Sequence, residues 1–149
     1  MTDLLLAIVH HCLAFGLAGL LFAELVLVRP GLDRQGLQRL GRIDGLYGAV
    51  AVALILVGTG RLFMGLKGSE FYIDNPVFWL KIAAFLTVGL LSLPPTLRFV
   101  RWRRAAAASG AYVVPDAEVR AMRFYIHAEL TIFVFILIFA AAMARGYGL

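Results

Sequence analysis

The chain has 149 residues, of which 62% are hydrophobic and only 15% are charged. Soluble domains are about 45–50% apolar and about 25% charged, so this composition excludes a water-soluble globule and indicates a membrane protein. The formal net charge is +5, and the single cysteine excludes an intrachain disulfide.

Four apolar stretches follow one another along the chain, and each is long enough to cross a bilayer as a helix of about 20 residues. They cover residues 4–28, 45–66, 76–99 and 124–144. Each must be a helix, because four segments cannot close a barrel and lipid offers the backbone no other partner. The sequence therefore predicts an all-α fold, with residues 1–149 forming a single transmembrane domain built as an integral membrane four-helix bundle.

Most of the basic residues lie in two of the three connecting segments. Segment 29–44 holds four arginines and segment 98–123 holds six, out of 14 basic residues in the chain, whereas the second connection has only Lys67. The positive-inside rule places both arginine-rich segments in the cytoplasm. We therefore expect a multi-pass protein of a bacterial inner (plasma) membrane with both termini outside, in the periplasm. Anionic lipid headgroups account for the basic charge, so nucleic acid is not an expected partner.

The connecting segments carry local signals as well. Asp33 is a predicted N-cap of an interfacial helix that continues into the second span. Trp102, which stands among arginines, is expected to anchor the chain at the level of the lipid headgroups. Residues 105–110 are small and are expected to form a mobile loop. Pro115 and Asp116 predict the start of the last helix.

Ionisable side chains within the spans are the most informative residues, because a charge at the centre of a membrane helix costs roughly 2.5–3.5 kcal/mol. The candidates are His10, His11, Glu24, Arg61, Lys81, His127 and Glu129. At about 1.5 Å of rise per residue, His10, Arg61 and Lys81 all lie within about 9 Å of the outer surface. We expect these three side chains to converge on an outward-leaning pocket among the first three spans.

Several details bear on this outer pocket. His11 points about 100° away from His10 and is the less favoured interior residue. Gly58 and Gly60 permit close approach of a helix or a ligand near Arg61. The alternative is that Arg61 and Lys81 snorkel to the surface and that His10 is a hydrogen-bonded core residue.

A second group lies within about 10 Å of the cytoplasmic edge. His10 and Glu24 are fourteen positions apart, which brings their side chains to within about 40° of each other around the helix, so both are predicted to face the bundle. We expect Glu24 to pair with a basic or imidazole group, and His127 is the nearest by depth. Alternatively, Glu24 and Glu129 pair with cytoplasmic arginines such as Arg123. His127 and Glu129 are about 200° apart and cannot both point at one spot.

An imidazole close to two cations can serve a limited range of chemistry. Neutral imidazole is a ligand of haem iron, and arginine and lysine can bind haem propionates or other carboxylates. A neutral lysine can itself ligate iron. A carrier of small anions would use the same two cationic side chains, Arg61 and Lys81. The sequence has no serine–histidine–aspartate set, no HExxH motif and no phosphate-binding glycine loop, which leaves hydrolysis and nucleotide chemistry without support. The lack of a dense Met or Cys cluster argues against a copper(I) site.

Several short segments together resemble one known family. They are Asp44-x-x-Tyr47-Gly48, Gly58-x-x-Arg61, Asn75-Pro76-x-Phe78-x-x-Lys81 and Ser92-x-Pro94-Pro95-Thr96, in addition to His10 and Glu24. Over nearly its whole length the chain resembles the bacterial membrane-protein family catalogued as domain of unknown function 2214, which implies no established activity. A more distant resemblance, through His10 and Trp79-Leu80-Lys81, is to the CopD-like group that includes protoporphyrinogen oxidase of the HemJ kind. That resemblance implies haem b, with His10 and Lys81 at the matching positions.

Two functions remain open from the sequence. In the first, His10, Arg61 and Lys81 bind haem b or a porphyrin in an outer-leaflet pocket, His10 being the candidate ligand of the haem iron, in a redox or porphyrin-handling role. In the second, the protein is a non-catalytic small transporter or assembly subunit whose intramembrane charges serve packing or gating. The sequence assigns no catalytic residue and leaves a homodimer open.

Overall fold

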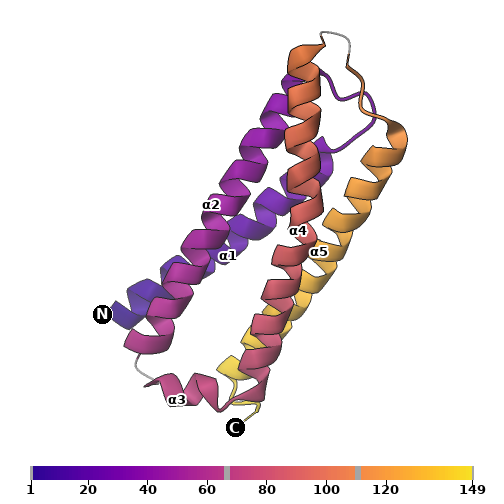
Figure 1. Cartoon of the computed structure of the whole chain (residues 1–149). Coiled ribbons are helices and arrows are strands. Elements are labelled where there is room, and N and C mark those ends of the chain that lie inside the picture. Colours follow the sequence, from indigo (N-terminus) through magenta and orange to yellow (C-terminus); the bar gives the residue numbers. More distant parts are fainter. Residues whose placement is uncertain (1, 66–67, 110–111, 149) are drawn as a thin grey trace.

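The computed structural model describes residues 2–65, 68–109 and 112–148. It contains five helices, of which α3 is short (Figure 1). They are α1 (Thr2–Leu27), α2 (Arg34–Met64), α3 (Gly68–Ile73), α4 (Pro76–Ala108) and α5 (Asp116–Ala144). The four long helices are each long and apolar enough to cross a membrane. The part of the chain that the structure describes contains no strand, which confirms the all-α prediction.

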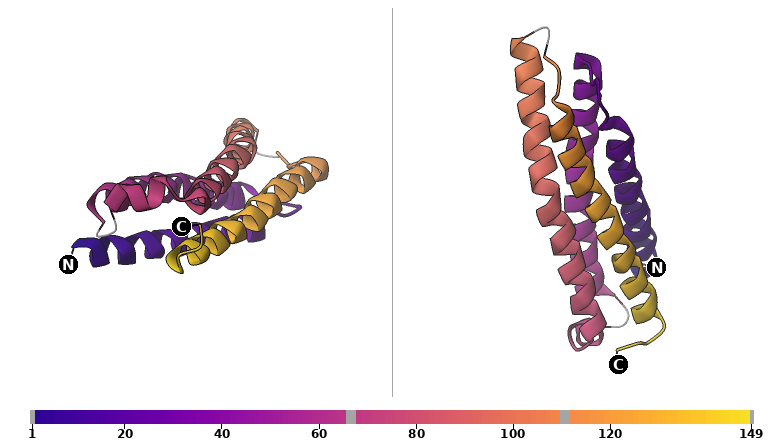
Figure 2. Two further views of the ribbon diagram at one scale, coloured as in Figure 1. Left: turned by 90° about the horizontal axis from the view of Figure 1, so that it is seen from below. Right: turned by 90° about the vertical axis from the view of Figure 1, so that its right-hand side faces the viewer.

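The long helices form two hairpins. α1 packs along α2, and α4 packs along α5 (Figure 2). The hairpins touch each other mainly through α2 with α4 and α1 with α5. At one end of the bundle α2 and α4 separate, and α3 bridges them; both termini lie at this end (Figure 1). We call it the α3 end.

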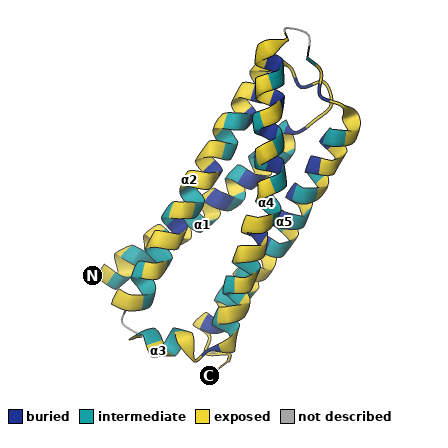
Figure 3. Ribbon diagram, in the orientation of Figure 1, coloured by how far each residue is buried: buried dark blue, intermediate teal, exposed yellow. Residues whose placement is uncertain are grey.

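The packed core lies in the opposite half of the bundle (Figure 3). Its largest buried side chains come from all four long helices: Trp102, Phe99, Leu17, Leu21, Leu37, Leu40 and Ile126. Large apolar side chains elsewhere point outward, for example Leu56 and Leu90, each 68% exposed. Lipid tails are as apolar as leucine, so this outer surface suits a bilayer and close packing holds the helices together.

The starts of α2 and α5 agree with the sequence predictions. α2 begins at Arg34, Asp33 is its N-cap, and the Gly36 backbone N–H donates to Asp33 Oδ1 at 2.7 Å. The helix then continues without a break into the second span, as predicted. Pro115 and Asp116 also start α5 as predicted.

Two predictions about the connections were wrong. The segment expected to be a mobile loop from residue 105 continues α4 to Ala108, because alanine has the highest helix propensity of all residues. Trp102 does not lie at the surface but is buried, with its indole N–H donating to Glu118 Oε2 at 2.7 Å. An acceptor within reach lets the polar edge of the ring enter the core.

The second connection contains the helix α3, which the sequence reading missed. Three positions named in the predictions lie outside the described residues: the end of the second span at Leu66, the basic residue Lys67 and the end of the expected loop at Gly110.

The helix α4 runs through Pro94 and Pro95. Proline has no backbone N–H, so the helix lacks two of its internal hydrogen bonds at this level.

The orientation of the bundle remains a prediction from the arginines. We expect a reporter that is active only outside the cytoplasm to be active when fused after Leu149 and inactive when fused at Ser109. The reason is that basic connections are retained on the cytoplasmic side. The reverse pattern of activity would place the α3 end in the cytoplasm.

Candidate functional site

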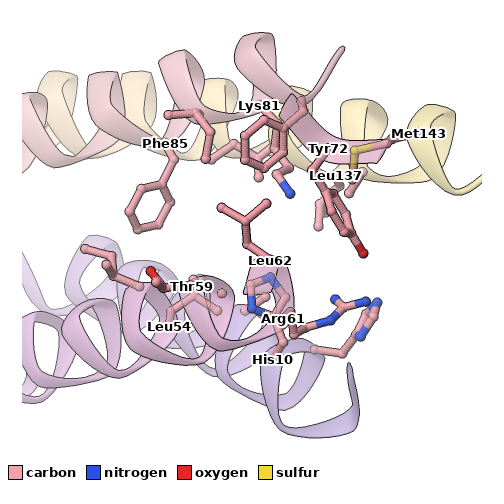
Figure 4. Close-up of a pocket in the computed structure, with 18 of the residues that line it drawn as sticks. His10, Leu54, Thr59, Arg61, Leu62, Tyr72, Lys81, Phe85, Leu137 and Met143 are labelled. Atoms are coloured by element: carbon pink, nitrogen blue, oxygen red, sulfur yellow. The ribbon is translucent and has the colours of Figure 1, made fainter. Parts of the chain in front are cut away.

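A cavity of about 350 Å³ lies between the two hairpins at the α3 end (Figure 4). Its wall includes the three side chains that the sequence predicted to converge, His10 from α1, Arg61 from α2 and Lys81 from α4. Figure 4 shows Lys81 on one side of the cavity and His10 with Arg61 on the other. The structure therefore brings these three residues to one cavity, while its role as a binding site stays a prediction.

The rest of the wall is largely apolar and aromatic. α5, which the prediction left out, contributes one side with Phe133, Leu137 and Met143, and Tyr72 comes from the unpredicted α3. The apolar run of α5 gave no sign of this, because nothing in it distinguishes a cavity wall from a face toward lipid. The cavity is thus lined by all five helices rather than by the first three spans.

Gly58 sets the position of the His10 ring. A Cβ atom at Gly58 would lie 3.3 Å from His10 Cε1, closer than an ordinary van der Waals contact. The absence of a side chain on α2 therefore lets the imidazole pack directly against that helix. At Gly60 the nearest atom would be Leu6 Cδ2 at 3.8 Å, an ordinary contact. Of the two glycines that the sequence singled out, Gly58 is the one that makes room for the site.

The polar atoms of the site are poorly satisfied. His10 Nδ1 and Arg61 Nε are buried and have no hydrogen-bond partner among the described residues. Leaving such an atom without a partner costs about 1–3 kcal/mol. Lys81 Nζ lies 5.1 Å from the centre of the Phe78 ring, a cation–π contact. Within the described ranges the only salt bridge joins Arg98 to Glu118, so no carboxylate pairs with Arg61 or Lys81.

The inner group of candidate residues is only partly brought together. Glu24 and Glu129 are buried, 3% and 1% exposed, so Glu24 faces the bundle as expected. His127 is exposed, and its Nδ1 lies 2.6 Å from the Arg123 carbonyl oxygen. The expected Glu24–His127 pair is therefore wrong. The two residues match in depth, but Glu129 takes the inward face of α5 and turns His127 away.

The alternative pairing with arginine is not formed either. Arg123 Nη1 donates to the carbonyl oxygens of Leu25 at 2.9 Å and Val28 at 2.8 Å, at the end of α1. The partner of Glu129 is Tyr47, whose hydroxyl donates to Glu129 Oε2 at 3.3 Å. Tyr47 was not a candidate, although the Asp44-x-x-Tyr47-Gly48 segment that carries the family resemblance contains it.

Comparison with known proteins gives the family but no activity. Searches of curated proteins and of solved structures found no match. A family model described as "Predicted membrane protein (DUF2214)" matches residues 2–148, almost the whole chain. Four apolar helices long enough to span a bilayer agree with that description. The chain belongs to this family of predicted membrane proteins.

Proposed function

We propose that the cavity at the α3 end binds haem b or a related porphyrin. Such a molecule combines an apolar ring with carboxylates, and in haem with an iron that accepts an imidazole nitrogen. The cavity offers a matching set: apolar and aromatic walls, two basic side chains and an imidazole. Its volume of about 350 Å³ lies at the lower end of the range of ligand pockets, about 300–1,000 Å³.

The observation that carries the proposal is the absence of any acidic partner for the basic groups. Arg61 and Lys81 line one cavity with walls that are mainly apolar, and neither forms a salt bridge within the described residues. Two cations that share a site of low dielectric repel each other, so the site favours a ligand with negative charge. Carboxylates on an apolar ring supply that charge without leaving the wall unfilled.

Each of the three residues has a defined task in this proposal. His10 has no hydrogen-bond partner in the described part of the chain, so its ring is free to act as a ligand. Arg61 presents a planar guanidinium that holds a carboxylate through two parallel hydrogen bonds, and Lys81 acts as a point charge. Haem iron held in this way would supply one-electron chemistry, and an iron-free porphyrin would be a molecule that the protein handles.

The direct test is a visible absorption spectrum. The protein is purified in detergent and titrated with haem b, and in parallel with iron-free protoporphyrin. We expect saturable binding, with a shift of the main haem band that indicates imidazole ligation. A spectrum identical to that of haem in empty detergent micelles would refute the proposal. Binding of small inorganic anions in its place would favour the transporter alternative.

Gly58→Ala is expected to weaken haem binding on the order of tenfold, which corresponds to about 1.4 kcal/mol. The added methyl group forces the His10 ring to shift by a few tenths of an ångström away from α2. The measurement is a haem titration followed by absorbance. Gly60→Ala is the matched control, because it changes helix propensity equally but meets only Leu6 at 3.8 Å. Equal losses in both variants would contradict a positioning role for Gly58.

A further inference from the structure

A cluster of ionisable side chains, buried except for the half-buried Asp44, lies in the half of the bundle away from the α3 end, where the two hairpins meet. It consists of Glu24 on α1, Asp44 and Tyr47 on α2, and Glu129 on α5. Tyr47 is 6% exposed, and Glu24 and Glu129 are buried more deeply still. The charges of Glu24, Asp44 and Glu129 lie close enough to act on one another. None of these residues lines the cavity at the α3 end, so the cluster is separate from the site described above.

Glu24 stands out within this cluster because it has no partner. Its Oε1 atom is buried and accepts no hydrogen bond from any described residue. The other two carboxylates are better served. Tyr47 donates to Glu129 Oε2 at 3.3 Å, and the Thr96 hydroxyl on α4 donates to Asp44 Oδ1 at 2.6 Å. An ionised carboxylate needs several donors, whereas a protonated one carries its own.

The cations around the cluster do not compensate Glu24. Arg103 on α4 acts on Asp44. Arg123 on α5 is held by the backbone carbonyls of Leu25 and Val28. The described residues contain no salt bridge to Glu24 or Glu129. Neighbouring carboxylates in a low dielectric disfavour one another's charged form, and this favours a protonated Glu24, which has no cation beside it.

We propose that Glu24, with Glu129 and Tyr47, forms a proton-binding site in this half of the bundle, with Glu24 holding the proton at neutral pH. The proposed ligand is a proton, since the described residues contain no group of three or more His, Cys, Asp or Glu side chains placed so that they could hold a metal ion together. Glu24 lies three residues before the end of α1, which is about one turn of helix. The site is therefore close to the end of the helix.

Infrared spectroscopy of the full chain in lipid vesicles tests this proposal. The wild-type protein at neutral pH should show the carbonyl stretching band of a protonated carboxylic acid. Glu24→Gln should remove this band. The control is Glu70→Gln on α3, an exposed glutamate whose replacement should leave the band unchanged. Absence of the band in the wild-type protein, or a band that survives in Glu24→Gln, would overturn the assignment.

Two further measurements guard the interpretation. Glutamine has the shape of a protonated glutamate, so Glu24→Gln should fold and melt at the wild-type temperature at neutral pH. A marked loss of stability would instead indicate an ionised Glu24 and would overturn the proposal. In Glu129→Gln, where the neighbouring carboxylate is removed, the band should remain but disappear at a lower pH than in the wild type. If Na⁺ abolishes the wild-type band when it replaces a large organic cation, the site takes a metal cation and the proposal fails.

Discussion

Replacing His10 by alanine is expected to abolish imidazole ligation of haem while the protein remains folded. The ring has no hydrogen-bond partner in the described chain, so its removal breaks no polar contact within the protein. Ligation of iron by imidazole depends on that one side chain, so the loss should be complete rather than graded. The measurement is the visible spectrum of purified protein with added haem, together with a far-ultraviolet circular dichroism spectrum that reports the helices.

His11→Ala is the matched control for this experiment. His11 is the next residue along α1 and also borders the cavity, but it is exposed and its Nδ1 lies 2.6 Å from the Ala7 carbonyl oxygen. We expect this variant to keep the wild-type haem spectrum. A full spectrum in His10→Ala combined with its loss in His11→Ala would move the ligand to the neighbouring residue. A full spectrum in both would leave His127 as the remaining imidazole of the chain.

Trp102→Ala is expected to lower the free energy of unfolding by about 3–5 kcal/mol, more than any other substitution proposed for this protein. The ring is 1% exposed and packs against Phe99, with 5.5 Å between the ring centroids. The substitution leaves a hole in the core and removes the donor at 2.7 Å from Glu118 Oε2. Thermal unfolding in detergent, followed by circular dichroism, measures the effect as a lowered midpoint.

The other tryptophan of the chain supplies the comparison. Trp79 is 53% exposed, and its indole N–H donates to the Ile73 carbonyl oxygen at 2.8 Å. Trp79→Ala therefore removes one hydrogen bond and little packing. We expect it to lower the free energy of unfolding by about 1 kcal/mol. Similar shifts of the unfolding midpoint in the two variants would show that the core around Trp102 does not dominate the stability of the bundle.

The sequence predicts the level of a residue in this bundle far better than the direction of its side chain. Depth follows from counting residues along a helix, and on this basis His10, Arg61 and Lys81 were expected at one level, where they line one cavity. Direction depends on how each helix is rotated against its neighbours. For this reason the depth match between Glu24 and His127 gave the wrong pair, since His127 faces away from the core.

The same limit explains the residues that were missed. The four long helices follow from hydrophobic length alone, and the start of α2 follows from the capping preference of Asp33. The wall that α5 adds to the cavity and the contact of Tyr47 with Glu129 arise from packing between distant parts of the chain. Neither leaves a local pattern that a single sequence could reveal.

The paired prolines of α4 have a mechanical consequence for the bundle. Pro94 and Pro95 interrupt the backbone hydrogen bonding between Phe85, on the cavity wall, and Phe99, in the packed core. Bending a helix is easiest where those bonds are missing. Bending of α4 is therefore expected at this level, with the part of the helix toward the α3 end moving relative to the part in the packed core. The width of the cavity can then change without any repacking of the core.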